Sequence, residues 1–332
     1  MNAAAPPLPP IAQPWHAGER AVQARVGVHD KLAQLGPRVI RPYMPDQHRD
    51  FFAQLPFVVA GTVDAQGQPW ASVLAAPPGF MHSPDAGRLT VHARPGWGDP
   101  LRDTLAESAP IGLLGIEPHT RRRNRLNGTV RALSEAGFSV QVGQSFGNCP
   151  KYIQAREPVY LADVDTTAPH PVHEDDRLDD AARALVREAD LLFIATACLG
   201  TPGHDDGPAY GVDVSHRGGR PGFVRVDRGA DGRDVLTVPD FLGNFFFNTL
   251  GNLVVNPRAG LLFVDFARGD LLYLAVDAQI VWDGPEVAAF EGAQRLMRLT
   301  VRRMRRVAGV LPLRWGAATL SPALEGTGTW TA

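Results

Sequence analysis

Polar and glycine-rich segments in the second half of the chain have the composition of a phosphate site. Residues 238–252 read VPDFLGNFFFNTLGN and run from an expected strand, through a turn, into an expected helix over 245–252. Backbone N–H groups at such a turn and helix start point outward and suit an anion. A capping role for Asn244 and a solvent-facing Asn248 are the alternative. The candidate ligand-binding residues in this segment are Pro239, Asp240, Gly243, Asn244, Asn248 and Thr249.

A second segment, residues 215–223, is a glycine-rich turn that contains two arginines. The forked guanidinium group suits phosphate oxygens, and glycine lets the backbone approach a ligand closely. Arg217, Arg220 and Phe223 are therefore candidate cofactor-binding residues. A plain hairpin turn with solvated charges explains the same residues equally well.

The first half of the chain contains a different cationic segment, RRRNRLNG at residues 121–128. Side chains alternate along a strand, so Arg123, Arg125 and Asn127 share one face. Like charges on one face repel each other, and a polyanionic ligand would relieve that cost. The row is either an anion site or a solvated face of a sheet.

Missing motifs, net charge and composition exclude several other classes of function. The sequence has no G-x-G-x-x-G fingerprint after a strand, no Walker loop, and no H-E-x-x-H or G-x-S-x-G motif. A net charge of −2 over 332 residues argues against a nucleic-acid partner. No apolar run is long enough to span a bilayer, so no membrane partner is expected. The only two cysteines, Cys149 and Cys198, form no C-x-x-C pair, which favours a cytoplasmic location.

No metal site is expected either. The close pair His170 and His173 flanks Pro171, and proline disfavours the helix that would place both rings on one face.

Cys149 lies near Lys151 and is a redox-thiol candidate, although a structural cysteine is the more common outcome.

The elements that must position these residues occur twice along the chain. LPFVVA at 55–60, PPGF at 77–80 and IGLLGI at 111–116 correspond to LLFIAT at 191–196, RPGF at 220–223 and AGLLFV at 259–264. The spacing between equivalent residues drifts by a few positions, as in a diverged domain duplication. Short runs bounded by Gly, Pro and Asp predict β-strands in both copies.

This repeat divides the chain into five expected segments. They are an N-terminal helical lead-in (1–50, its helix over 17–35 ended by Gly36-Pro37), a first repeat (51–160), a connector with a helix (161–189), a second repeat (190–284), and a C-terminal helix and tail (285–332). The C-terminal helix is expected over 285–307, with one arginine-rich face. We interpret that face as solvated, because the whole chain is nearly neutral.

These motifs resemble the pyridoxamine 5′-phosphate oxidase-like family of FMN-binding split β-barrels. The resemblance covers most of residues 50–160 and 190–282, including GNCPKYI at 147–153. It implies a mainly β fold with flanking helices, in which two tandem split β-barrels form a pseudo-dimer within one chain. It also implies FMN in the groove between the barrels, with its phosphate near residues 240–252. Lys151 then joins Arg123 and Arg125 as a candidate cation near the flavin ring.

The two copies differ in complementary places. The first has RPGWGDP at 94–100, with the anionic Asp99, where the second has its phosphate turn. The second has LLYLA at 271–275 where the first has its arginines. We therefore expect one composite site that combines the turn of the second repeat with the arginine face of the first.

Three functions agree with this pattern. The first is a flavin-dependent oxidoreductase acting on a small molecule, with NAD(P)H or oxygen as electron partner. The second is a flavin- or haem-binding module without turnover, in which the available axial ligands are His82, His92, His119 and His216. The third is a structural protein with a vestigial site. The sequence predicts no specific catalytic residue, and a homodimer is compatible with the family resemblance.

Overall fold

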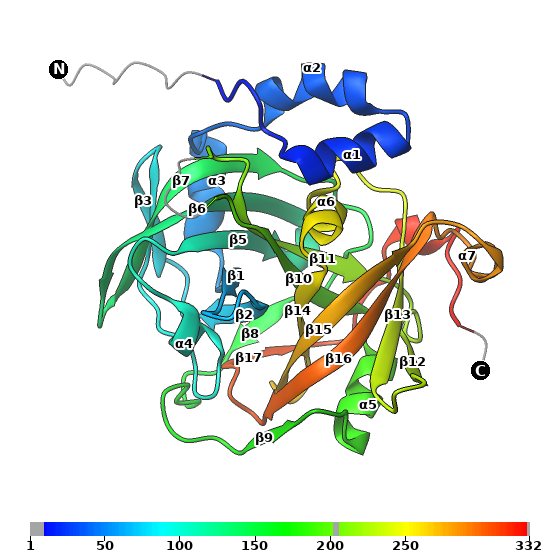
Figure 1. Ribbon diagram of the computed structural model, residues 1–332. Coiled ribbons are helices and arrows are strands. Elements are labelled where there is room, and N and C mark those ends of the chain that lie inside the picture. Colours follow the sequence, from blue (N-terminus) through cyan, green and yellow to red (C-terminus); the bar gives the residue numbers. More distant parts are fainter. Residues whose placement is uncertain (1–9, 202–205, 331–332) are drawn as a thin grey trace.

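The computed structural model describes residues 10–201 and 206–330 (Figure 1). Residues 1–9 of the expected lead-in lie outside the described residues. The elements of the first half are α1 (Ala17–Arg25), α2 (His29–Val39), α3 (Asp46–Gln54), β1 (Phe57–Val63), β2 (Pro69–Ala75), β3 (Met81–Asp85), β4 (Arg88–Val91), α4 (Leu101–Thr104), β5 (Pro110–Glu117), a 3₁₀ turn (Pro118–Thr120), β6 (Arg122–Ser134) and β7 (Gly137–Gly147).

The second half follows a connector that contains short strands and one helix. Its elements are β8 (Pro158–Tyr160), β9 (Val172–Asp175), α5 (Asp180–Glu188), β10 (Leu191–Cys198), β11 (Gly211–Gly218), β12 (Arg225–Arg228), β13 (Asp234–Asp240), α6 (Asn248–Val255), β14 (Arg258–Val264), β15 (Leu271–Val281), α7 (Pro285–Ala289), β16 (Arg295–Val307), β17 (Leu313–Trp315) and a 3₁₀ turn (Pro322–Leu324). Within the described part of the chain, no helix is long and apolar enough to cross a membrane.

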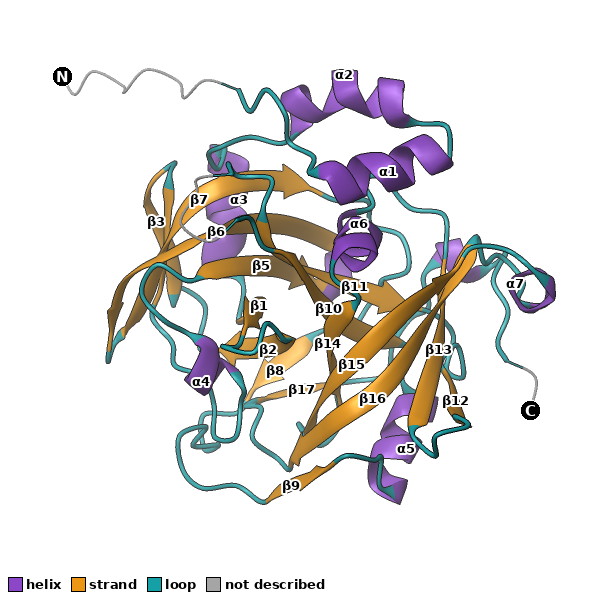
Figure 2. Cartoon of the chain, in the orientation of Figure 1, coloured by secondary structure: helices purple, strands orange, loops and turns teal. Residues whose placement is uncertain are grey.

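The fold is mainly β, and its two sheets have the same topology. The first sheet has the strand order β2-β1-β5-β6-β7-β4-β3, and the second has β11-β10-β14-β15-β16-β13-β12. Each strand of one sheet occupies the place of its counterpart in the other, and all pairings are antiparallel. The internal duplication predicted from the sequence is therefore present at the level of the fold (Figure 2).

Strands β1 and β10 lie between two apolar layers. One face of each strand contributes to the core of its own repeat, and the other face contributes to a third core shared by both repeats. Consequently β1 is buried over six consecutive residues and β10 over its whole length. A strand buried on both faces has no polar alternation, which explains the continuous apolar runs in the sequence.

Two equivalent glycines allow the sheets to approach closely. A Cβ atom on Gly112 of β5 would lie 2.5 Å from the carbonyl oxygen of Val212 in β11. A Cβ atom on Gly260 of β14 would lie 2.5 Å from Cα of Trp70 in β2. Strand β5 of the first repeat thus contacts β11 of the second, and the equivalent strand β14 of the second repeat contacts β2 of the first.

The predicted C-terminal helix over 285–307 is wrong. Only α7 is helical there, and residues 295–307 form β16, an interior strand between β15 and β13. Buried Leu299 and Val301 alternate with less buried Arg298 and Thr300, which is the period of a strand. The second sheet therefore extends to Val307, beyond the expected limit of the second repeat at 284.

The basic face of that segment is neutralised by acidic partners. Carboxylates come from the second sheet, α7, the connector and the first repeat. The pairs are Arg295–Asp240, Arg298–Glu286, Arg302–Asp277, Arg303–Asp64, Arg305–Glu174 and Arg306–Asp179. The arginines thus help to bind the connector and the first repeat to β16.

Two further helix predictions need correction. The helix expected over 17–35 is divided into α1 and α2 by a turn at Gly27, whose φ is +74°, and α2 continues through Pro37 to Val39. The helix expected over 245–252 begins at Asn248, because Phe245 and Phe247 have φ values of 64° and 61°.

Candidate functional site

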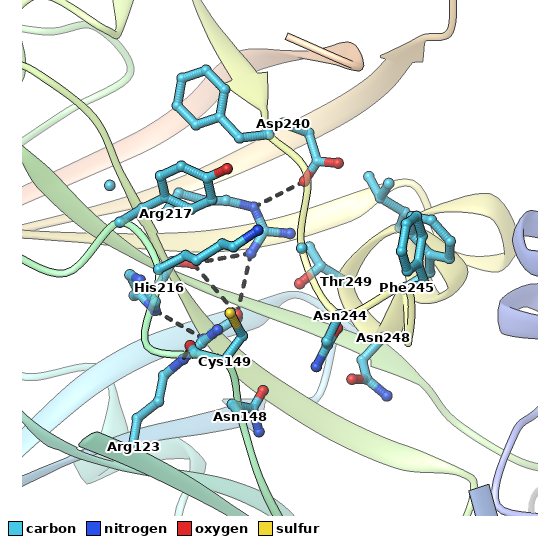
Figure 3. A pocket seen from close by; sticks show the side chains of 18 of the residues that line it. Arg123, Asn148, Cys149, His216, Arg217, Asp240, Asn244, Phe245, Asn248 and Thr249 are labelled. Atoms are coloured by element: carbon cyan, nitrogen blue, oxygen red, sulfur yellow. Dashed lines mark hydrogen bonds and ion pairs between the residues drawn. The ribbon is translucent and has the colours of Figure 1, made fainter. Parts of the chain in front are cut away.

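A cleft lies between the two repeats, where β6 of the first faces β11 and the β13–α6 loop of the second. Its empty volume is about 700 Å³, solvent at its mouth included. Figure 3 shows Arg123, Asn148 and Cys149 on one side, and Asn244, Phe245, Asn248 and Thr249 on the other.

Arg123 is held by the loop that follows β7 and by β11. Its Nε donates to the Cys149 carbonyl at 2.9 Å, and its Nη1 lies 2.9 Å from Nδ1 of His216. Burial lowers the pKa of Arg123 well below its usual value, and the charges of Arg125 and Arg217 lower it further. Clustered cations of this kind are stabilised by an anion.

Arg125 crosses the interface two residues further along β6. Its Nη1 donates to Oδ1 of Asn248 at 2.9 Å, and its Nη2 donates to the Ser215 hydroxyl at 2.5 Å. Asp213 lies 3.4 Å from Nη1 and forms a buried ion pair. Among described residues the buried Nε has no hydrogen-bond partner. Arg125 lines the cleft, and its buried Nε–H is left without an acceptor among these residues.

Arg217 and Asp240 bring charge from the second repeat. Nε of Arg217 lies 3.3 Å from Oδ1 of Asp240, while Arg295 donates to Oδ2 of the same carboxylate at 2.9 Å. Two arginines therefore share one carboxylate. Burial lowers the pKa of Arg217, and the charge of Asp240 opposes that change.

The β13–α6 loop forms the opposite wall. Asn244 accepts a hydrogen bond from the backbone N–H of Phe246 at 3.1 Å, so its side chain fixes the turn. Helix α6 then begins without a side-chain cap. Uncapped N–H groups at a helix start attract anions, and Asn248 and Thr249 are the first residues of this helix.

Aromatic side chains complete the cleft. Phe245 and Phe247 pack edge to face with ring centroids 6.1 Å apart, and Tyr152 packs on Phe241 at 5.1 Å. The Tyr152 hydroxyl donates to the Leu242 carbonyl at 3.1 Å and so links the two repeats. Phe245 is 36% exposed, which leaves an aromatic surface available for a planar ligand.

Most of the residues predicted from the sequence line this one cleft. They are Arg123, Arg125, Lys151, Arg217, Asp240, Gly243, Asn244, Asn248 and Thr249.

Four predicted residues do not line this cleft. Asn127 donates to Asp213 at 2.7 Å behind the cleft, and Arg220 donates to the Leu324 carbonyl at 3.1 Å. Phe223 is fully buried in the core of the second repeat. Pro239 pairs with Leu296 inside the sheet. Each of the four is close in sequence to a residue that does line the cleft.

The sequence analysis left out several residues of the cleft wall, namely Asn148, Tyr152, Ser215, Gly218, Phe241, Phe245, Phe247 and Leu250. It named Cys149 only as a redox-thiol candidate and His216 only as an available haem ligand, and both line the cleft. All are close in sequence to predicted residues. The available signal was the FFF run at 245–247, because three contiguous phenylalanines cannot all be buried in a helix start.

His216 has no ring nitrogen available for a metal. Nδ1 is 2.9 Å from Arg123, and the ring also bonds to the backbone of Lys151. Burial lowers the pKa of His216 well below its usual value, and the charges of Arg123 and Arg217 lower it further. The ring is therefore neutral. Among the cleft residues that the structure describes, His216 is the only histidine.

The equivalent groove on the other side of the interface is different. Tyr273 lies opposite Leu262 in the second sheet as Arg125 lies opposite Leu114 in the first. Its hydroxyl donates to Oδ2 of buried Asp99 at 3.0 Å. Burial raises the pKa of Asp99 to about 6. A buried Tyr–Asp pair thus replaces the arginines of the first groove.

Comparison with known proteins places the first repeat in a family. Residues 44–161 match the family model for pyridoxamine 5′-phosphate oxidase. No curated protein matches the chain.

Three of the similar solved structures each match about two fifths of the chain. HupZ of Group A Streptococcus, as a histidine-to-alanine variant, has 14% identity and a TM-score of 0.27 over 39% of this chain and 98% of its own. A candidate pyridoxamine 5′-phosphate oxidase of Lactobacillus delbrueckii has 14% identity and a TM-score of 0.27 over 39% and 94%. HutZ of Vibrio cholerae, a haem storage protein, has 16% identity and a TM-score of 0.25 over 40% and 96%. The match of residues 44–161 shows that the first repeat is similar to the pyridoxamine 5′-phosphate oxidase-like family.

Proposed function

We propose that the cleft binds FMN and that the chain is a flavin-dependent oxidoreductase acting on a small molecule. The observation that carries the proposal is the charge of the cleft. Cations of both repeats line it, namely Arg123, Arg125, Lys151 and Arg217. Among described cleft residues the only carboxylate is Asp240, which two arginines already share. A phosphate dianion would offset this excess of positive charge.

The donor set also suits a phosphate ester on steric and hydrogen-bonding grounds. The unpartnered Nε of Arg125 and the uncapped start of α6 are N–H donors in need of an acceptor. No atom within 4 Å would obstruct a Cβ at Gly243, so a ligand can approach that backbone. Phe245 supplies an aromatic face on which a flavin ring can stack.

FMN fits the cleft better than haem does. A haem iron takes its axial ligand from the protein, most often a histidine nitrogen. The neutral ring of His216 already uses Nδ1 as an acceptor from Arg123 and bonds to the backbone of Lys151. The other predicted ligands, His82, His92 and His119, do not line the cleft.

Bound FMN would supply hydride or single-electron transfer, and the protein would bind and orient the reactants. Arg123 and Arg125, the latter bonded to Asn248 at the start of α6, would bind the phosphate, and Lys151 would favour negative charge on the bound ring. The open mouth beside Phe245 is where we place a small-molecule substrate and an electron partner, NAD(P)H or oxygen. Both cysteines are free thiols, as a cytoplasmic location would keep them.

The test is the absorbance spectrum of the purified full chain together with FMN and riboflavin titrations. The proposal predicts a flavin spectrum and FMN binding at least tenfold tighter than riboflavin binding, because riboflavin lacks the phosphate. Bleaching of bound FMN by NADH or NADPH supports the oxidoreductase. A Soret band would replace FMN by haem, and a chain that binds neither ligand would have only a vestigial site.

A further inference from the structure

The N-terminal helix α1 packs directly on α6, the helix whose first residues form one wall of the cleft (Figure 1). The contact depends on two glycines that face each other. A Cβ on Gly251 of α6 would lie 2.5 Å from Cγ of Glu19, and a Cβ on Gly18 would collide with the carbonyl oxygen of Gly251. Close backbone contact of this kind fixes α1 at one position on α6.

Glu19 of α1 is buried at this contact and bonds to a cleft residue. Its Oε1 accepts from Nδ2 of Asn248 at 2.5 Å, and its Oε2 accepts from the backbone N–H of His16 at 2.9 Å. The side chain of Glu19 is 3% exposed. Burial raises its pKa well above the usual value, and nearby Asp213 raises it further.

Asn248 links Glu19 to Arg125 through two hydrogen bonds. An amide that donates through Nδ2 to Glu19 must present Oδ1 on its other side, and Oδ1 accepts from Arg125 at 2.9 Å. If the amide were reversed, its NH₂ group would face the guanidinium group, where two donors would repel each other. Glu19 therefore determines the amide orientation that holds Arg125 in the cleft.

We infer that Glu19 is a positioning residue for the phosphate-binding arginine, and that α1 is part of the ligand site although it does not line the cleft. This inference rests on the proposed function only for the identity of the ligand. Helix α1 lies outside residues 44–161, the segment that matches the family model. The inference thus assigns a role in ligand binding to a segment that neither the cleft nor that match includes.

The first arm of the test needs no ligand. A double-mutant cycle combines Glu19→Ala with Arg125→Ala and follows urea unfolding of the full chain. Residues in one hydrogen-bond network show coupling, whereas independent sites are additive. We expect the folding equilibrium constants to deviate from additivity by about fivefold or more. Additive effects would overturn the inference. The pair Glu19→Met with Arg125→Ala serves if the alanine variant does not fold, because methionine has a similar volume and offers Asn248 no carboxylate acceptor.

The second arm measures FMN and riboflavin affinity. Glu19→Ala should weaken FMN binding about tenfold and leave riboflavin binding within about twofold, because only the phosphate contacts Arg125. Glu19→Gln keeps an acceptor for Asn248 and should retain most of the FMN affinity. The control is Val22→Ala, which removes buried side-chain atoms from α1 without touching Asn248.

The two arms separate the two claims. Coupling without FMN binding by the wild-type chain would sustain the positioning role and defeat FMN as the ligand. FMN binding that Glu19→Ala leaves unchanged, or reduces no more than Val22→Ala does, would defeat the positioning role and leave the proposed function intact.

Discussion

Asp99 provides a quantitative test of the claim that a buried Tyr–Asp pair replaces the arginines in the second groove. Its Oδ2 accepts from Tyr273 and its Oδ1 accepts from the backbone N–H of Leu101 at 2.7 Å, and the residue is 1% exposed. In a dry groove, burial raises the pKa of Asp99 from 3.8 to about 6. In an open, hydrated groove the carboxyl would keep its ordinary pKa.

The raised pKa has a definite consequence for stability. The folded state binds the Asp99 proton more tightly than the unfolded state does, so the contribution of Asp99 to the free energy of unfolding is greatest at low pH. It falls as the pH rises from about 4 through about 6. A gap of about 2.2 in pKa at 1.36 kcal/mol per unit corresponds to about 3 kcal/mol, with roughly half of it above pH 5.

The variant Asp99→Asn isolates this contribution. Its amide keeps an acceptor for Leu101 but does not titrate. Urea unfolding of both proteins from pH 4 to pH 8 should show the wild type losing about 2.4 kcal/mol relative to the variant, because all other titrating groups cancel. Parallel stability curves would refute the reasoning, since they would mean that Asp99 is hydrated and the groove open.

Three further predictions concern the cleft and the interface. Arg123→Ala and Arg125→Ala should each weaken FMN binding by about 1.5–3 kcal/mol in titrations and hardly affect riboflavin, as the loss of a charged hydrogen bond would; equal losses for both ligands would contradict this. Raising NaCl from roughly 0.05 to 0.5 M should weaken FMN binding but not riboflavin binding, and a salt-independent FMN affinity would argue against phosphate recognition. Gly112→Ala should destabilise the chain by about 2 kcal/mol or more in urea unfolding, because its Cβ would lie 2.5 Å from the Val212 oxygen; a change below about 0.5 kcal/mol would show that the interface can relax.

Local sequence patterns were sufficient to predict the duplicated fold. Continuous apolar runs such as Phe57–Val63 have no helical period, and repeated turn residues divide the chain at equivalent places. The same reasoning failed for residues 295–307, where many arginines suggested a helix with one basic face. Their carboxylate partners come from distant segments such as Asp64 and Glu174, and a single segment cannot reveal them.

The site was predictable only in part, again because some of its contacts join residues that are far apart in the sequence. Alternation along β6 placed Arg123 and Arg125 on one face, and both line the cleft. The role of Glu19 depends on a bond to Asn248, 229 positions away, and α1 carries no ligand-binding motif. Left-handed backbone at Phe245 and Phe247 is a property of the folded loop, which local helix propensity did not indicate.

The number of FMN molecules bound per chain tests the central claim most directly. The measurement is a fluorescence titration of the purified full chain, with the double variant Arg123→Ala/Arg125→Ala as its counterpart. The account predicts one FMN per wild-type chain and loss of that binding in the double variant. Two equivalent FMN molecules per chain, or undiminished binding by the double variant, would contradict a single composite site between the repeats.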